Sequence, residues 1–398
     1  MKLYLQMGHG MQSMCNDLIR HWGDGTVIFS PVNTKRSKLA SLSKQYHKSG
    51  GTVLFDPQLY YPHDGADNLQ LYDYWPDYNM SITDSAIHRK ICRDIFTINQ
   101  EIGSESIIIP GVEMDIDAFE YGLTWLSDSA CYFRGHTDKS LLATVCLYTE
   151  VLRSSQTVED LVDRLAQIDV DGFYIVARSS NEEYIISDAN WMIGLTKLIA
   201  CLKLSGKKTV LAYTNHQGLI ASLAHADAIA SGNYMNTRQF VPERFQSKKG
   251  DIDRRKSNWY FHPYALTEYK ASLLDVAYNR KYLDSFMPLG EYQNPYSEML
   301  FAGAIPSATS YNEPRSFMHY LHCMRTLCAS LSCEDYDATK ERLSFMLDTA
   351  ENKIHEYSLK GLKSQNRDFG IGIEAMRIAA AALDEDYGFR LRLDWNRL

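Results

Sequence analysis

Short runs of apolar residues alternate, over the first 240 residues, with segments in which apolar positions recur every three or four residues. The short runs predict buried β-strands, and the periodic segments predict amphipathic helices. The predicted strands are 2–7, 25–30, 51–56, 105–110, 141–148, 171–178, 208–214 and 227–231. The predicted helices lie near 11–22, 35–48, 84–102, 115–130, 157–168, 189–203 and 216–225.

Strands that are apolar over nearly their whole length are typical of a parallel sheet covered on both faces. Eight strand–helix units in succession favour a (β/α)8 TIM-like barrel over an open doubly wound sheet. The glycine-rich turn that binds dinucleotides in open sheets is missing after the first strand, where only Gly8 and Gly10 occur. We therefore predict an α/β fold in which residues 1–240 form the barrel core.

Residues 241–398 have a different pattern, in which helical periodicity dominates. The predicted helices lie near 264–282, 315–332, 335–357 and 372–384. We expect this C-terminal helical region to supply the last barrel helix and to extend from the barrel as an appended unit.

The formal net charge of -8 argues against binding nucleic acid through a broad basic surface. Segment 244–256 is an exception, since it holds six basic and two acidic residues. The candidate contacts to a phosphate backbone there are Lys248, Lys249, Arg254 and Arg255. The alternative is that this segment is a solvated loop.

No apolar run approaches the length that spans a membrane, and the first residues lack the apolar core of a signal peptide. The eight cysteines are scattered, which favours reduced thiols. These features predict a cytoplasmic protein with no membrane partner.

Polar residues follow most of the predicted strands. In a barrel of this type the loops after the strands meet at one end, where chemistry takes place. Asp56 and Glu150 are the predicted catalytic residues, and Glu113 and Asp115 are further candidates. The predicted substrate-binding residues are His9, Tyr148, Arg178, Asn215, His216, Ser231 and Asn233.

Asp56 ends the apolar stretch "TVLFD" and precedes Pro57. A carboxylate at this position can act as a general base or accept hydrogen bonds from paired N–H donors such as those of a guanine edge. The alternative is an aspartate that caps the following turn. The next loop, 58–81, carries five tyrosines and Trp75, which either stack on a flat base or pack against the barrel rim.

The set His9, Asp56 and His216 could hold a metal ion, but the paired H-x-H spacing of metal hydrolases is missing. The pattern H-x-x-H-C-x4-C-x4-C at 319–333 has helical spacing and does not match a zinc knuckle. We predict neither a metal nor a cofactor.

Several stretches carry a resemblance to one enzyme family. They are "KLYLQMGHG", "TVIFSP", "TVLFDPQ", "DGFYIVARSSNEE" and "KTVLAYTNHQGLIASLAHADAIASGNYMNTRQF". In order and spacing, residues 1–240 resemble the tRNA-guanine transglycosylase superfamily. The resemblance implies that Asp56 engages a guanine or 7-deazaguanine base, and that the ligand is a nucleobase or nucleotide.

The chain departs from the family at three places. The position of the nucleophilic aspartate on the eighth strand is Ala230 here, and the family's other aspartate on that strand corresponds to Asp227. The glycine-rich loop after the fifth strand reads "CLYTEVL", and the family's zinc site is not recognisable after residue 240.

The resemblance therefore implies base recognition in nucleic-acid modification or antiphage defence, without the usual nucleophile. Possible partners are a nucleic acid or a protein of the same operon, and the family's frequent dimers make a homodimer compatible with this interpretation. Two alternatives remain open: a non-catalytic scaffold that binds a partner, and a metal-dependent barrel hydrolase.

Overall fold

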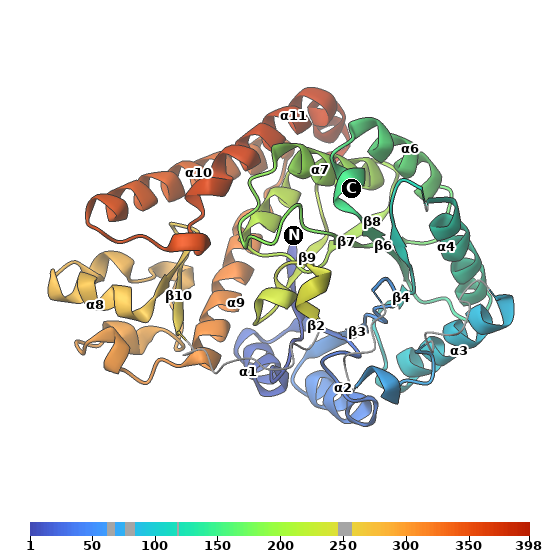
Figure 1. The fold of residues 1–398 in the computed structure, drawn as a ribbon, viewed down its shortest axis with the longest axis horizontal. Helices are drawn as coiled ribbons and strands as arrows, with labels where there is room; N and C mark the ends of the chain where they lie inside the picture. The colour runs from blue at the N-terminus through green and yellow to red at the C-terminus, as the bar shows by residue number, and fades with distance from the viewer. Residues whose placement is uncertain (62–67, 76–83, 118, 246–256) are drawn as a thin grey trace.

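The computed structural model of the protein describes residues 1–61, 68–75, 84–117, 119–245 and 257–398. Parallel strands form a nearly closed barrel, and the helices surround it (Figure 1). The strands of this sheet are β1 (Lys2–Gln6), β2 (Gly25–Phe29), β3 (Gly51–Phe55), β4 (Ile107–Ile109), β5 (Glu113–Met114), β6 (Leu141–Leu147), β7 (Gly172–Ala177), β8 (Lys208–Leu211) and β9 (Ala228–Ser231). The helices up to β9 are α1 (Gln12–Trp22), α2 (Leu39–Lys48), α3 (Ser85–Ile102), α4 (Phe119–Arg134), α5 (Thr149–Leu152), α6 (Ser155–Leu165) and α7 (Ala189–Leu204).

The strands pair in the order β3-β2-β1-β9-β8-β7-β6-β4, and the short β5 also pairs with β6. The two ends of this order meet where the amide of Glu105 donates to the carbonyl of Val53 at 3.1 Å. The predicted (β/α)8 TIM-like barrel is confirmed, and each of the eight predicted strands overlaps a strand of the sheet.

Side chains along the strands alternate between two apolar layers, as strand geometry requires. On β6, Leu142 and Cys146 belong to the cluster inside the barrel, whereas Leu141 and Val145 belong to the layer between strands and helices. The interior is therefore a packed core, and access for a ligand depends on the loops at the barrel ends.

The C-terminal region contains the strand pair β10 (Trp259–His262) and β11 (Thr267–Lys270) and the helices α8 (Ala271–Asn279), α9 (Glu313–Ser330), α10 (Tyr336–Leu359) and α11 (Gly370–Asp394). Helix α9 packs against β1 and α1, and α11 lies along α7 (Figure 1). The C-terminal region thus supplies helices that cover the barrel, as predicted, although α10 and α8 lie away from it.

Two helix predictions are wrong. Segment 264–282 is helical only from Ala271, because β11 and the turn before it occupy its first part. Segment 216–225 forms a 3-10 helix over His216–Ser222, and α11 packs against it. Both segments are short apolar stretches whose conformation depends on contacts distant in sequence, which periodicity does not report.

A buried ion chain joins the barrel to the C-terminal region. The Arg238 guanidinium donates to Glu268 Oε1 at 2.9 Å and Arg367 donates to Glu268 Oε2 at 2.9 Å. Burial alone would raise the pKa of Glu268, but the two guanidinium groups lower it, so the carboxylate stays charged.

A search of the helices in the described part of the chain finds none with both the length and the apolar character needed to cross a lipid bilayer.

Candidate functional site

Asp56 follows β3 and points into the barrel, where its side chain is fully buried. Its Oδ2 atom accepts hydrogen bonds from the hydroxyls of Tyr60 at 2.8 Å, Tyr174 at 3.1 Å and Tyr213 at 2.8 Å. Its Oδ1 atom accepts from the amide of Gln58 at 3.0 Å. Both oxygens of the predicted catalytic carboxylate are therefore satisfied within the protein.

The backbone on either side of this cluster has an unusual conformation. Gln58 has φ of 53° and Tyr213 has φ of 49°, values in the left-handed region that non-glycine residues rarely adopt. The two residues are joined, since Gln58 Nε2 donates to the Tyr213 hydroxyl at 2.9 Å. The contacts to Asp56 offset the local cost of this conformation, which is of order 1–3 kcal/mol per residue.

Burial raises the pKa of Asp56 to about 6, and the hydrogen bonds from Tyr213, Gln58, Tyr60 and Tyr174 oppose the rise. The carboxyl group is held by neutral phenols and has no cationic partner among the described residues. Since no oxygen is open, a base can reach Asp56 only if one of these tyrosines moves.

A cleft opens at the mouth of the barrel, at the carboxyl ends of β6 and β7. It is a cavity of about 340 Å³, lined by Tyr148, Thr149, Glu150, Arg178, Ser179, Ser180, Asn181, Glu182, Val241, Pro242 and Glu243. Three predicted site residues, Tyr148, Glu150 and Arg178, thus share one cavity. We call it the mouth cleft.

Arg178 is the central cation of the mouth cleft. Its Nη1 lies 3.3 Å from Glu113 Oε1 and its Nη2 lies 3.1 Å from Glu243 Oε1. The guanidinium carbon stands 4.7 Å from the centre of the Tyr148 ring, within the range of a cation–π contact. The backbone of Arg178 is also fixed in place, because its carbonyl accepts a hydrogen bond from the Trp191 indole at 2.9 Å.

The charges in the mouth cleft are strongly coupled. Burial raises the pKa of Glu113 even though Arg178 opposes the shift. Burial would lower the pKa of Arg178, but Glu113 and Glu243 raise it above its ordinary value. Glu150 and Glu182 also line the cavity, so carboxylates outnumber the one arginine there. The cleft therefore favours a ligand that offers several N–H donors together with an acceptor for Arg178.

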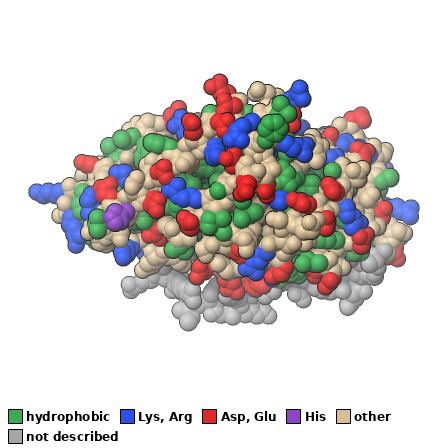
Figure 2. Space-filling view, turned by 90° about the horizontal axis from the view of Figure 1, so that it is seen from above, with side chains coloured by type: hydrophobic (Ala, Val, Ile, Leu, Met, Phe, Trp, Pro, Cys, Tyr) green, Lys and Arg blue, Asp and Glu red, His purple; other side chains and the backbone are tan. Residues whose placement is uncertain are grey.

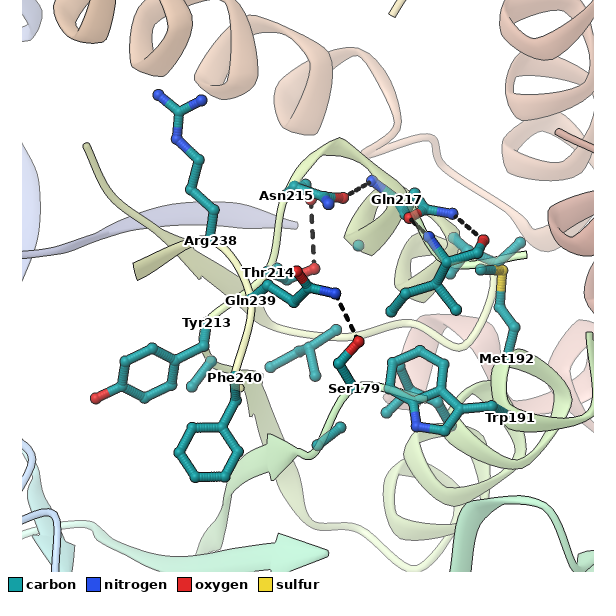
Figure 3. A pocket seen from close by; sticks show the side chains of 17 residues that line it. Ser179, Trp191, Met192, Tyr213, Thr214, Asn215, Gln217, Arg238, Gln239 and Phe240 are labelled. Atoms are coloured by element: carbon teal, nitrogen blue, oxygen red, sulfur yellow. Dashed lines mark hydrogen bonds between the residues drawn. The ribbon is translucent and has the colours of Figure 1, made fainter. Parts of the chain in front are cut away.

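A second cavity lies next to β8, where Gln239 Nε2 donates to Ser179 Oγ at 2.5 Å (Figure 3). Asn215 and Gln217 line it, but their side-chain amides are bonded to backbone groups. Its volume of about 30 Å³ is that of a single water molecule and far below the roughly 300 Å³ of the smallest ordinary ligand sites. It is too small for a nucleobase.

The other predicted substrate-binding residues have local structural contacts. Asn215 caps the 3-10 helix and donates to the carbonyl of Tyr184 at 2.8 Å. Asn233 donates to the carbonyl of the exposed His9 at 2.9 Å. Ser231 is buried beside the Tyr320 hydroxyl, 3.3 Å away. The structure brings none of these residues to the mouth cleft.

His216 is buried among aromatic rings, with its ring centre 4.7 Å from that of Phe369. Burial lowers the pKa of His216 to about 3, so the ring is neutral. Among the described residues its two ring nitrogens have no hydrogen-bond partner.

Within the part of the chain that the structure describes, no three His, Cys, Asp or Glu side chains are grouped closely enough to hold a metal ion. The histidines, Cys323 and Cys328 of the pattern at 319–333 lie along α9, and Cys333 follows the end of this helix. His319 Nε2 donates to the Phe261 carbonyl at 2.8 Å, and Cys323 is buried. The predicted phosphate contacts Lys248, Lys249, Arg254 and Arg255 lie outside the described residues.

The aromatic residues of loop 58–81 that the structure describes pack inward. Tyr72 and Tyr74 are buried against Phe55, and Tyr74 donates to the carbonyl of Pro57 at 3.0 Å. This arrangement favours the packing alternative for these residues over base stacking.

The positions that the resemblance aligns with the family's strand-eight aspartates differ in orientation. Ala230 lies in the barrel interior, where it presents only a methyl group. Asp227 lies at the other end of the strand, where it accepts from Lys203 at 2.9 Å. No described carboxylate from β9 enters the barrel interior.

Sequence reasoning missed the tyrosines around Asp56 and also Glu243. The inward position of Tyr174 could have been predicted, because its side chain is on the same face of β7 as Arg178. Tyr213 carried none, because its inward position depends on the left-handed backbone after β8. Glu243 reaches Arg178 from 65 residues further along the chain, a distance that only the folded barrel closes.

Comparison of the sequence with models of known protein families finds no match, and comparison with curated proteins finds no match either.

Proposed function

We propose that this protein recognises a guanine-type nucleobase, guanine or a 7-deazaguanine, in the mouth cleft, as a relative of the tRNA-guanine transglycosylases. The observation that carries the proposal is the grouping of Arg178, Glu243 and Tyr148 around one cavity at the carboxyl ends of the strands, where Glu113 holds Arg178 from behind. This end is where TIM-type barrels bind their ligands.

The chemistry of the base supports the assignment. One edge of guanine offers the N1–H and amino donors, which a carboxylate such as Glu243 accepts. The O6 atom of the same base is an acceptor for an arginine. The ring of Tyr148 provides a flat surface for stacking, and an aromatic–base stack contributes about 1–3 kcal/mol. The cavity of about 340 Å³ is within the range of small-molecule sites.

In this proposal Asp56 does not touch the base directly. Its two oxygens are occupied by Tyr60, Tyr174, Tyr213 and Gln58, which fill the space beneath the mouth. Asp56 instead fixes the positions of the tyrosines that pack beneath the mouth cleft. Cys146 is the register partner of Glu113 in the β5–β6 pair, and both Glu113 and Asp56 contribute to the raised pKa of its buried thiol.

Base transfer by the usual route needs a carboxylate nucleophile near the sugar. The interior position on β9 is Ala230, so recognition of the base is the part of the family's activity that the chain retains in this proposal. Any nucleic-acid modification or antiphage role would then require a different catalytic group to act on the bound base. The candidate is Glu150, which lines the mouth cleft.

The test is binding of free guanine, of a 7-deazaguanine precursor and of adenine, measured by calorimetry and by thermal shift. Guanine at a hundredfold its dissociation constant should add roughly 2.7 kcal/mol of stability. Replacing Arg178 with Met should weaken guanine binding by about 5- to 150-fold, since a good arginine–base contact contributes roughly 1–3 kcal/mol.

The matched control is Arg164→Met, which removes a surface arginine paired with Glu120 on the outside of the barrel. This variant should bind guanine like the wild type. Equal affinity for guanine and adenine, or no binding of either base, would remove the proposal.

A further inference from the structure

A cavity lies at the opposite end of the barrel from the mouth cleft, at the amino ends of β1, β2 and β3. Its volume is about 510 Å³, which is within the range of small-molecule sites. The polar and charged residues that line it include Lys2, Tyr4, Thr26, Thr52, Glu105 and Arg325. We call it the amino-end cavity.

Three side chains from neighbouring strands form a row in the amino-end cavity. Tyr4 of β1 is the register partner of Thr26 of β2, which in turn is the register partner of Thr52 of β3. Residues of one register row point to the same side of a sheet, and Tyr4 packs against the cluster inside the barrel, so the row faces the interior. Glu105 continues the row, because its amide donates to the carbonyl of Val53 beside Thr52.

The hydrogen bonds along this row run in one direction. Thr52 Oγ1 donates to Glu105 Oε2 at 2.8 Å. A hydroxyl has one proton, so Thr26 is the donor in the 2.9 Å contact between its Oγ1 atom and that of Thr52. The Thr26 oxygen and the second oxygen of Glu105 therefore remain open as acceptors on this side of the cavity.

The β1 side of the cavity offers donors instead. The Tyr4 hydroxyl has no hydrogen-bond partner among the described residues. Burial, together with the carboxylates of Glu105 and Asp227, raises the pKa of Tyr4 to about 12, so the hydroxyl keeps its proton at neutral pH. Lys2 lies two residues earlier on the same face of β1, and in the part of the chain that the structure describes its ammonium group has no carboxylate partner.

The remaining charged side chains of the cavity are paired with each other. The Arg325 guanidinium bonds Asp24 and also stands 4.8 Å from the centre of the Trp22 ring. Lys2 and Glu105 are thus the two charges that a ligand can engage. Acidic and basic side chains are interspersed on the surface that Figure 2 shows, so these local groups, and not a broad field of one sign, select the charge of the ligand.

The positions of the two charges fit a small ligand with a charge at each end. The strand that carries Lys2 and the segment that carries Glu105 are three strand positions apart, about 14 Å along the sheet. Both side chains line the cavity and take up part of this width. The space that remains is spanned by a molecule of the size of an amino acid with an ion pair at each end.

We propose that the amino-end cavity binds an α-amino acid, with its carboxylate held by Lys2 and Tyr4 and its ammonium group held by Glu105 and Thr26. Each end of such a zwitterion meets an opposite charge and a further hydrogen-bonding group, which offsets the loss of water from both. The amino-end cavity shares no lining residue with the mouth cleft, so this proposal does not rest on base recognition.

The test is calorimetric titration of the full chain with each of the standard L-amino acids and with glycylglycine, whose two charges are further apart. We expect saturable binding of at least one free amino acid, tighter than that of the dipeptide. Acetylation of its amine, or conversion of its carboxylate to an amide, removes one charge at a time. Each change should weaken binding by about tenfold or more.

Two variants assign the ends of the ligand. Lys2→Met should bind the free amino acid and its amide equally, because the partner of the carboxylate is gone, and Glu105→Gln should bind the free and the acetylated forms equally. Lys44→Met and Glu374→Gln remove exposed charges elsewhere and should bind like the wild type. Circular dichroism checks the fold, and guanine binding should be the same in all four variants.

Three results would overturn the proposal. They are the absence of binding of every amino acid up to the millimolar range, binding that survives both Lys2→Met and Glu105→Gln, and equal affinity for an amino acid blocked at both ends. Tighter binding of glycylglycine would overturn the assignment to a single amino acid.

Discussion

Two carboxyl groups at the same end of the barrel, those of Asp56 and Glu243, have opposite surroundings. Asp56 is fully buried and held by three tyrosine hydroxyls, with no cation among its described partners. Glu243 lines the mouth cleft, lies 3.1 Å from Arg178 and has 54% of its side chain exposed.

The comparison shows that a position at a strand end is not sufficient to make a binding residue. Phenols satisfy the Asp56 oxygens and fill the volume a ligand would need. At Glu243 the neighbouring groups leave room, so the same kind of group remains available to a ligand. Access, which depends on the surrounding side chains, separates a structural carboxylate from a candidate site.

The largest expected effect comes from Asp56→Asn. The folded pKa of Asp56 is about 6 and its ordinary value is 3.8. Because the folded value is the higher one, the unfolded chain releases this proton first as pH rises, and wild-type stability falls between about pH 4 and pH 6. The free energy of unfolding lost through the titration of this group should total about 3 kcal/mol above pH 6.

Asparagine does not titrate, so the variant lacks this contribution. The difference in unfolding free energy, wild type minus variant, should therefore decrease by about 3 kcal/mol from pH 4 to pH 7. Urea denaturation at several pH values measures it. A difference that does not change with pH would mean that Asp56 titrates normally and is not sealed in the barrel.

The next effect comes from Tyr213→Phe, which removes one of the three hydroxyls on Asp56 and the acceptor of Gln58. Hydrogen bonds to charged groups contribute about 1.5–3 kcal/mol, so we expect a loss of about 2 kcal/mol at pH 7. The loss should shrink toward pH 5, where Asp56 becomes protonated. Tyr278→Phe, whose hydroxyl bonds the Gly303 carbonyl at the surface, is the control and should change stability by less than about 0.5 kcal/mol.

On the other side of the comparison, Glu243→Gln should weaken guanine binding about tenfold and leave adenine unaffected. The reason is that an amide is a poorer acceptor than a carboxylate for the N–H donors of the base, by about 1.4 kcal/mol. Calorimetric titration measures the change. Glu120→Gln, at an exposed pair on the outer surface, should bind like the wild type.

The smallest effect is on stability at the mouth cleft itself. Arg178→Met should change the unfolding free energy of the ligand-free protein by no more than about 1 kcal/mol, since partly exposed ion pairs contribute little. Chemical denaturation checks this value. A much larger loss would show that Arg178 is a structural residue like Arg238, and the comparison between the two carboxylates would lose its meaning.

The strands and their order could be predicted from the sequence, because a buried parallel strand is a local apolar run and successive units pack side by side. The inward parity of Arg178 and Tyr148 also follows from the alternation of side chains once the strand boundaries are known. The β10–β11 pair could not be predicted, since its aromatic residues also fit a helical pattern and pairing depends on the opposite strand.

The sequence by itself therefore determined the (β/α)8 architecture and the list of polar residues at the strand ends. Only the tertiary structure decided which of these residues are accessible. Tyr60 and Tyr213 are 153 residues apart, yet their hydroxyls are 3.0 Å from each other on Asp56. Glu243 is 65 residues from Arg178 and still bonds it. Closure of the barrel creates both contacts, and no local sequence pattern encodes that closure. For this reason no local pattern could distinguish the buried carboxylate of Asp56 from the accessible carboxylate of Glu243.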